Sequence, residues 1–213
     1  MSQVQEGRTP LKIAVFASGS GSNFQALVES LRASNAPAAE IALLVCDKPQ
    51  AKVAERAERL SVPAFLFSPK NYPSREAYEK EIVAKLEEAG IGLIVLAGYM
   101  RLVTDTLVAP YYGRMINIHP AILPSFPGLN AIGQALEHGV KVTGATVHFV
   151  DGGMDSGPII AQRVVEVREE DTEDSLAKRI QAVEHELLPQ SVRLIAEGRV
   201  SIDKRKVNVR LGD

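Results

Sequence analysis

Short apolar runs rich in β-branched residues alternate with segments whose apolar residues recur at helical spacing, and this alternation constrains the fold more than any other feature. The apolar runs predict strands in the first half of the chain at 11–17, 41–46, 62–67, 91–97 and 114–118. Helices are expected after the first three of these strands, because apolar residues three and four positions apart mark one helix face. The alternation predicts βαβ units around a parallel sheet, and the continuous apolar strands predict helices on both of its faces.

The second half of the chain follows a different pattern, with a segment rich in Pro and Gly at 119–130 and a glycine-rich loop at 151–157. A short helix is expected at 131–138, and two long strands are expected on either side of the loop, at 140–150 and 158–167. Asp171 and Thr172 predict the cap of a further helix that Gly198 ends, and residues 199–210 predict a terminal strand pair.

Composition narrows the class of protein. A length of 213 residues predicts one domain. The apolar core of such a domain is large enough to be stable without a disulfide or a metal. The 24 Lys and Arg against 26 Asp and Glu argue against broad nucleic-acid binding. Cys46 is the single cysteine, which excludes a disulfide framework and a multi-cysteine zinc site. No metal is expected, because His119, His148 and Asp151 follow no recognised ligand spacing.

Nothing in the sequence predicts a membrane partner. Residues 1–10 are polar and lack the apolar centre of a signal peptide. The longest apolar runs, such as 91–100, have the length of a strand. We therefore expect a cytoplasmic enzyme.

The loop Ser18-Gly19-Ser20-Gly21-Ser22-Asn23 joins the first strand to a helix. Phe24 occupies the third glycine position of a dinucleotide fingerprint, and no Gly-Lys-Ser/Thr follows as in a Walker A motif. Glycines and the free amides at a helix start can still hold a single phosphate. The alternative is a tight turn with an Asn or Ser cap.

Asn117 and His119 end a strand, and the two-residue period places both side chains on the same side. An amide and an imidazole together can stabilise an oxyanion and move a proton. The alternative is a histidine that is merely hydrogen-bonded. Asp151 and Asp155 lie in a loop of small residues, where they would orient a histidine or simply form Asx turns.

Four segments together resemble one family: Ser18–Asn23, Leu96–Arg101, Asn117–Pro124 and Asp151–Pro158. Over residues 11–200 the chain is similar to the 10-formyltetrahydrofolate-dependent formyltransferases, and among them to the phosphoribosylglycinamide formyltransferases. The resemblance implies a Rossmann-like α/β fold, with a mostly parallel sheet, helices on both faces and an antiparallel C-terminal extension of the sheet. It also implies transfer of a formyl group from 10-formyltetrahydrofolate to the amine of glycinamide ribonucleotide.

The resemblance implies a role for each residue that matches a family motif. The implied catalytic residues are Asn117, His119 and Asp155. The implied contacts to glycinamide ribonucleotide are Gly21, Ser22, Asn23, Gln181 and Glu184. The implied contacts to 10-formyltetrahydrofolate are Arg75, Met100, Arg101, Leu102, Val103, Asn117, Asp151, Gly152, Gly153, Met154 and Asp155. Asn130 stands where many relatives carry His, so no role of that histidine carries over.

The implied organisation is an N-terminal leader at 1–10, one formyltransferase domain at 11–200 and a C-terminal strand or tail at 201–213. Within the domain, 11–110 would bind the ribonucleotide phosphate and 111–200 would bind folate and carry catalysis. The expected partners are the two small-molecule substrates, in a monomer or homodimer. Alternatives are hydrolysis of formyltetrahydrofolate, formyl transfer to another amine, or a nucleotide-binding module without catalysis.

Overall fold

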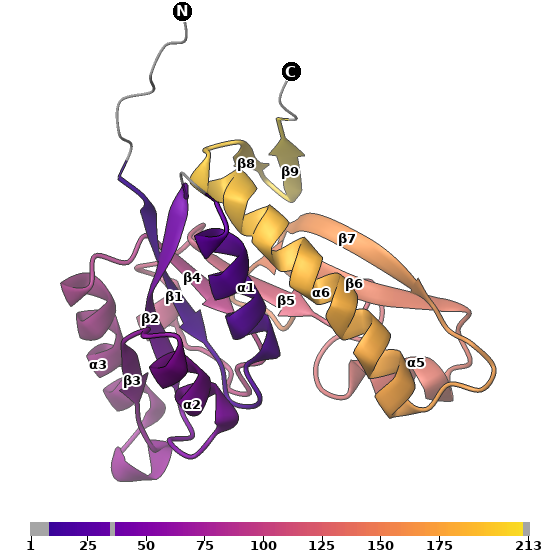
Figure 1. Cartoon of the computed structure of the whole chain (residues 1–213), viewed down its shortest axis with the longest axis horizontal. Coiled ribbons are helices and arrows are strands. Elements are labelled where there is room, and N and C mark those ends of the chain that lie inside the picture. The colour runs from indigo at the N-terminus through magenta and orange to yellow at the C-terminus, as the bar shows by residue number, and fades with distance from the viewer. Residues whose placement is uncertain (1–8, 35–36, 211–213) are drawn as a thin grey trace, which may run out of the picture.

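A seven-stranded sheet forms the centre of the computed structural model, which describes residues 9–34 and 37–210 (Figure 1). Its strands are β1 (Leu11–Phe16), β2 (Ala39–Cys46), β3 (Ala64–Leu66), β4 (Leu93–Leu96), β5 (Met115–His119), β6 (Val142–Phe149) and β7 (Ile159–Glu166). They lie in the order β3-β2-β1-β4-β5-β6-β7. The first five are parallel, whereas β6 and β7 are antiparallel to their neighbours. The predicted fold class is therefore confirmed.

Helices cover the sheet on both faces, because alternate residues of each strand point to opposite sides. Ile13 and Val15 of β1 face one apolar cluster, which includes residues of α1 (Ser22–Arg32), α2 (Lys52–Arg59) and α6 (Glu173–Ala196). The short α5 (Ala131–Glu137) also packs against this cluster through Ile132 and Leu136.

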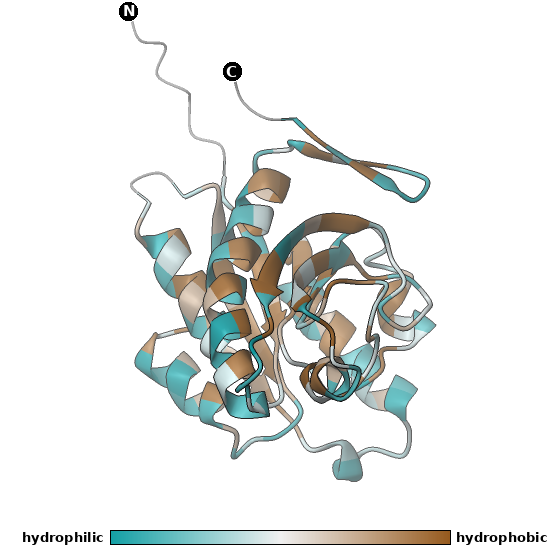
Figure 2. Ribbon diagram, turned by 90° about the vertical axis from the view of Figure 1, so that its right-hand side faces the viewer, coloured by the Kyte–Doolittle hydropathy of each residue, from teal (hydrophilic) through white to brown (hydrophobic). Residues whose placement is uncertain are grey.

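The opposite cluster takes Ala14 and Phe16 of β1, together with residues of α3 (Arg75–Glu88) and α4 (Asp105–Val108). In Figure 2 the central strands are coloured mainly hydrophobic, whereas most helices carry both colours. This pattern is the one expected of amphipathic helices on a sheet that is buried on both sides.

Most predicted elements are present with ends that differ by one to three residues. The third strand is shorter than predicted, at Ala64–Leu66. Sequence reasoning missed α4 and the 3-10 turn Pro69–Asn71, which are both too short to show a helical period.

The predicted terminal strand pair is a hairpin of β8 (Val200–Asp203) and β9 (Lys206–Val209), which forms its own sheet beside β7 (Figure 2). At its turn, an Arg205 guanidinium N–H donates a 2.9 Å hydrogen bond to the carbonyl oxygen of Ser156. Of the predicted leader at 1–10, only Thr9 and Pro10 lie within the described residues, and the predicted tail is described as far as Arg210.

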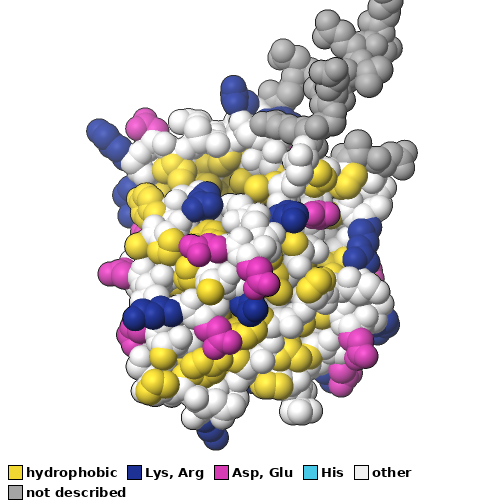
Figure 3. Space-filling model, turned by 90° about the vertical axis from the view of Figure 1, so that its left-hand side faces the viewer, with side chains coloured by type: hydrophobic (Ala, Val, Ile, Leu, Met, Phe, Trp, Pro, Cys, Tyr) yellow, Lys and Arg dark blue, Asp and Glu magenta, His cyan; other side chains and the backbone are white. Residues whose placement is uncertain are grey.

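Positive and negative side chains are interspersed on the face shown in Figure 3, rather than gathered by sign. Within residues 9–34 and 37–210, no helix has both the length and the apolar character to cross a bilayer. The same residues contain no group of at least three His, Cys, Asp or Glu side chains arranged to hold a metal ion.

Candidate active site

The register between β5 and β6 brings the polar residues of both strands together. Asn117 pairs with His148, and His119 pairs with Thr146. The alternate residues Ile116 and Ile118 belong to the apolar cluster under α1 and α6. Asn117, His119 and His148 therefore lie on the opposite face of the sheet, as the period of two predicts for the first two.

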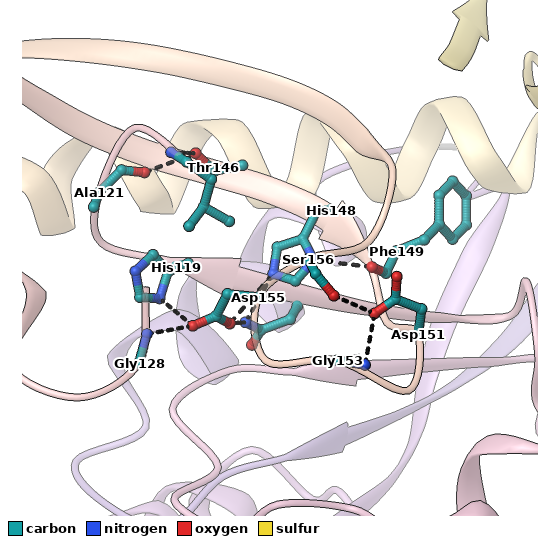
Figure 4. A network of polar contacts seen from close by, with 12 residues as sticks. His119, Ala121, Gly128, Thr146, His148, Phe149, Asp151, Gly153, Asp155 and Ser156 are labelled. Atoms are coloured by element: carbon teal, nitrogen blue, oxygen red, sulfur yellow. Dashed lines mark hydrogen bonds and ion pairs between the residues drawn. The ribbon is translucent and has the colours of Figure 1, made fainter. Parts of the chain in front are cut away.

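His119 is buried, and both of its ring nitrogens have partners. Its Nδ1 lies 3.5 Å from a carboxylate oxygen of Asp155 (Figure 4). Its Nε2 lies 2.8 Å from the carbonyl oxygen of Phe126, which can only accept a hydrogen bond, so that Nε2 carries a proton. A proton on Nδ1 as well would make an imidazolium whose charge faces Asp155.

His148 faces the amide of Asn117 and belongs to the same group. Its Nδ1 lies 2.9 Å from the carbonyl oxygen of Phe149 and therefore donates a hydrogen bond. Its Nε2 lies 3.1 Å from Asn117 Nδ2, so it accepts one proton of that amide in the neutral ring. The same Asn117 nitrogen is 3.3 Å from Asp155 Oδ1. His148 thus holds the orientation of the Asn117 side chain.

Asp155 is the acid at the centre of this group. The Gly128 N–H donates a 2.7 Å hydrogen bond to its Oδ2, and Oδ1 lies 3.6 Å from His148 Nε2. Burial by itself raises the pKa of Asp155, but His148, the Gly128 amide and His119 outweigh this effect and lower the pKa below its ordinary value. Asp155 is therefore a carboxylate at neutral pH, next to His119.

The loop 151–157 has a backbone shape that directs Asp155 towards His119. Asp155 itself is in the left-handed region, at φ 49°. A Cβ on Gly157 would lie 1.8 Å from the Phe149 carbonyl oxygen, so only glycine allows the loop to return this close to β6. Asp151 accepts hydrogen bonds from Gly153 N–H and Ser156 O–H. It therefore forms an Asx turn, whereas Asp155 is the aspartate of this loop that approaches a histidine. Gly152 and Met154 are exposed.

The glycine-rich loop leads directly into α1. Gly21 is the residue before the helix, at φ 73°, and a Cβ there would lie 2.5 Å from a methyl carbon of Val53. Ser22 and Asn23 form the first turn of α1. A depression of about 390 Å³ adjoins this loop, lined by Ser18, Gly19, Ser20, Lys48, Gln50, Ala51 and Lys52.

Gln181 and Glu184 of α6 are predicted to contact glycinamide ribonucleotide, and the structure brings Glu184 to this loop. The side-chain amide of Asn23 donates a 2.9 Å hydrogen bond to Glu184 Oε2. Glu184 is buried, and burial raises its pKa more than the Asn23 hydrogen bond lowers it. Gln181 is exposed, one turn nearer the start of α6.

The segment expected to bind the pterin follows β4. Met100 and Leu102 are exposed by 62% and 59%, which leaves apolar surface for a flat ring. Arg101 Nε donates a 2.7 Å hydrogen bond to buried Asp47, and Val103 is half-buried. Arg75 is exposed at the start of α3, and no described contact joins it to Asn117, His119 or Asp155.

Sequence reasoning missed a role for His148, which it weighed only as a metal ligand, and it gave no role to Asp47. It also missed the main-chain groups of Phe126 and Gly128. The sequence predicts that His148 lies in a strand, but only the pairing of that strand with β5 shows that His148 faces Asn117.

Known proteins are similar to this chain in both sequence and fold. The family model described as formyl transferase matches residues 11–192. The chain is 54% identical over 182 residues to the phosphoribosylglycinamide formyltransferase of Bacillus subtilis (strain 168), which covers 85% of this chain and 93% of that protein. Glycinamide ribonucleotide transformylase 1 from Symbiobacterium toebii has a crystal structure that matches with a TM-score of 0.92 at 44% identity, covering 96% of this chain and 99% of that one.

The enzyme of the same name from Geobacillus kaustophilus is 54% identical and has a TM-score of 0.85, covering 88% of this chain and 100% of that one. The family match extends over most of the sequence and includes Asn117, His119, His148 and Asp155. The chain therefore belongs to the formyl transferase family.

Proposed function

We propose that this enzyme transfers the formyl group of 10-formyltetrahydrofolate to the amine of glycinamide ribonucleotide, giving formylglycinamide ribonucleotide and tetrahydrofolate in purine biosynthesis. The observation that carries the proposal is the meeting of Asn117, His119 and Asp155 at one place on the sheet. The names of the similar enzymes support the choice of acceptor.

The reaction needs no covalent nucleophile from the protein. The neutral amine of the ribonucleotide attacks the formyl carbon, which forms a C–N bond and a tetrahedral intermediate with an oxyanion. Breaking the bond from that carbon to N10 of the folate completes the transfer, once N10 has gained a proton and the amine has lost one. The protein must stabilise the oxyanion and accept the proton from the amine.

Asn117 and His119 are the donors that we assign to the oxyanion. The Asn117 amide is held by His148, and the His119 Nε2–H is held by the Phe126 carbonyl. The oxyanion would replace that carbonyl as the acceptor at His119. Because donors of this kind act where charge develops, each contributes about 10²–10³ in rate.

Asp155 is assigned two tasks. Its negative charge lies 3.5 Å from His119 Nδ1, where it orients the ring whose Nε2–H is assigned to the oxyanion. It is also the base for the proton that the amine loses, received through a water molecule.

The ribonucleotide and the folate are assigned to different loops. The amides of Gly21, Ser22 and Asn23 at the start of α1 would hold the phosphate, because the positive end of a helix dipole attracts anions. Glu184 and Gln181 would accept or donate hydrogen bonds to the glycinamide.

The exposed apolar side chains of Met100 and Leu102 would bind the pterin. The remaining folate contacts would come from Arg75, Arg101, Val103 and the loop residues 151–155. We further propose that 10-formyltetrahydrofolate is the sole co-substrate, without a metal. A cytoplasmic monomer or homodimer is the expected form of the enzyme.

The test is an absorbance assay for loss of the formyl group from 10-formyltetrahydrofolate, with and without glycinamide ribonucleotide. We expect turnover only when the ribonucleotide is present. Turnover without it would show that water is the acceptor and that the enzyme is a hydrolase. Turnover with a different amine alone would overturn the assignment of Gly21, Ser22 and Asn23 to the ribonucleotide phosphate.

A further inference from the structure

Asp47 is a buried carboxylate that the proposed chemistry does not use. It directly follows β2, and its side chain is 1% exposed. An acid removed from water to this extent is costly unless it is paired and hydrogen-bonded. The hydrogen-bond partners of its two carboxylate oxygens therefore show which segments of the chain Asp47 holds in place.

One oxygen of Asp47 binds the loop after β1. The Ser18 hydroxyl donates a 2.5 Å hydrogen bond to Asp47 Oδ1. The same hydroxyl oxygen accepts a 2.9 Å hydrogen bond from the main-chain N–H of Met100. Ser18 is itself 3% exposed, so water does not compete for these hydrogen bonds.

The other oxygen of Asp47 binds the segment after β4. Arg101 Nε donates a 2.7 Å hydrogen bond to Asp47 Oδ2, and the Arg101 side chain is 38% exposed. Asp47 thus reaches the segment 100–103 twice, directly through Arg101 and indirectly through Ser18. The loop 18–23 and the segment 100–103 are the ones assigned to the two substrates.

We propose that Asp47 is a positioning residue for the folate, which fixes the segment 100–103 against the loop that holds the ribonucleotide. This inference rests on the proposed function. It adds the residue that sets the distance between the two substrate sites.

The carboxylate is required because both of its partners donate. Asparagine at position 47 would still accept the hydrogen bond from Ser18 through its carbonyl oxygen. Its NH₂ group would then face the N–H of Arg101, and two donors cannot pair. Asp47→Asn thus separates the contact to Arg101 from the contact to Ser18.

The experiment compares the steady-state kinetics of the wild type, Asp47→Asn, Arg101→Gln and the double variant. Asp47→Asn is expected to raise the KM for 10-formyltetrahydrofolate by about tenfold, the effect of losing a hydrogen bond to a charged group. The KM for glycinamide ribonucleotide should change by less than about twofold, because the hydrogen bond from Ser18 remains. The double variant should be no worse than Arg101→Gln alone, since both changes break the same contact.

Asp171→Asn is the matched control. Asp171 is another buried carboxylate, with a side chain 2% exposed and a 2.5 Å ion pair to Arg179. It precedes α6 and contacts neither the loop 18–23 nor the segment 100–103 in any described interaction. Its loss should lower the thermal midpoint without changing either KM by more than about twofold.

Calorimetric titration with 5-formyltetrahydrofolate, which donates no formyl group in this reaction, tests folate binding without turnover. Its Kd should rise by about tenfold in Asp47→Asn. An unchanged Kd, or equal effects on both KM values, would overturn the role of Asp47 while leaving the proposed function intact. Absence of transfer in the wild type would overturn the proposed function, and the Kd would still decide the role of Asp47. If Asp47→Asn does not fold, Ser18→Ala provides the second test, because it removes the hydroxyl that links Asp47 to the main-chain N–H of Met100. The Kd for 5-formyltetrahydrofolate should then rise, and an unchanged Kd would overturn the role of Asp47.

Discussion

Asn23 and Glu184 are 161 residues apart in the sequence, and the amide of Asn23 donates a 2.9 Å hydrogen bond to the Glu184 carboxylate. This hydrogen bond joins the first turn of α1 to the middle of α6. Because Glu184 is buried, the free energy lost on removing its carboxylate from water is only partly offset by one hydrogen bond. The site assigned to the ribonucleotide thus contains an acid that is costly to keep ionised until a substrate supplies more donors.

Glu184→Gln is expected to stabilise the free protein and to weaken its activity. The raised pKa of Glu184 means that the folded state holds the proton more tightly than the unfolded state. The free energy of unfolding of the wild type therefore falls as pH rises through the folded pKa of Glu184. The Glu184→Gln variant does not lose this stability, because glutamine does not ionise. At pH 7 the thermal midpoint should rise, by about 2–4 °C for each 1 kcal/mol of stability recovered. The KM for glycinamide ribonucleotide should increase. A midpoint that falls at pH 7 and is unchanged at pH 4 would contradict this account.

Asn117→Ala is expected to lower kcat/KM by about 10²–10³, because it removes one donor to the oxyanion. Purified protein and steady-state kinetics measure the loss, and circular dichroism checks that the fold is retained. Asn208→Ala, a change at an exposed asparagine of β9, is the control and should have wild-type kinetics. His119→Ala should show a loss of the same size. Near-normal turnover in either variant would exclude the assigned mechanism.

Asp155→Asn is expected to reduce kcat by about 10²-fold and to change the acid unfolding of the protein. The lowered pKa of Asp155 adds stability above its unfolded pKa of about 4, which is lost as pH falls through the lower folded pKa. The variant should therefore lose less stability than the wild type between pH 5 and pH 2, as measured by urea unfolding at each pH. Parallel curves for the two proteins would show that the carboxylate contributes no stability.

Gly21→Ala is expected to cost about 2–4 kcal/mol of the free energy of unfolding, since the new Cβ would meet Val53 at 2.5 Å in a left-handed conformation. Displacement of the first turn of α1 should also raise the KM for the ribonucleotide. Gly19→Ala is the matched change in the same loop, because a Cβ there has no neighbour within 4 Å. It should alter stability by less than about 1 kcal/mol. Equal losses in the two variants would exclude the contact with Val53 as the cause.

Local patterns were enough to predict most of the fold. The strand periods, the caps and the glycines act over a few residues, so the order of elements and the shared side of Asn117 and His119 follow from the sequence. The conformation of Asn130 has a local reason as well, since it precedes α5 at φ 54°, where Asn is better tolerated than most residues. The sequence alone did not show that this position needs a left-handed residue.

The rest of the site depends on tertiary pairing. His148 meets Asn117 only because β6 runs antiparallel to β5 in one particular register. Asp47 follows an apolar strand without any motif, and its partners lie on loops 29 and 54 residues away. The acceptor at Phe126 and the donor at Gly128 are main-chain groups, which carry no side-chain signature at all.

The pairing of β5 with β6 gives adjacent residues opposite tasks. Ile116 and Ile118 pack in the apolar cluster under α1 and α6, and Asn117 and His119 lie on the opposite face, near Asp155. A slip of one residue between these strands would turn the amide and imidazole into the apolar cluster under α1 and α6, and would turn the isoleucines towards the opposite face. The register that buries the two isoleucines is therefore also the register that brings Asn117 and His119 to Asp155, so an error in this one pairing would disrupt the core and the candidate site together.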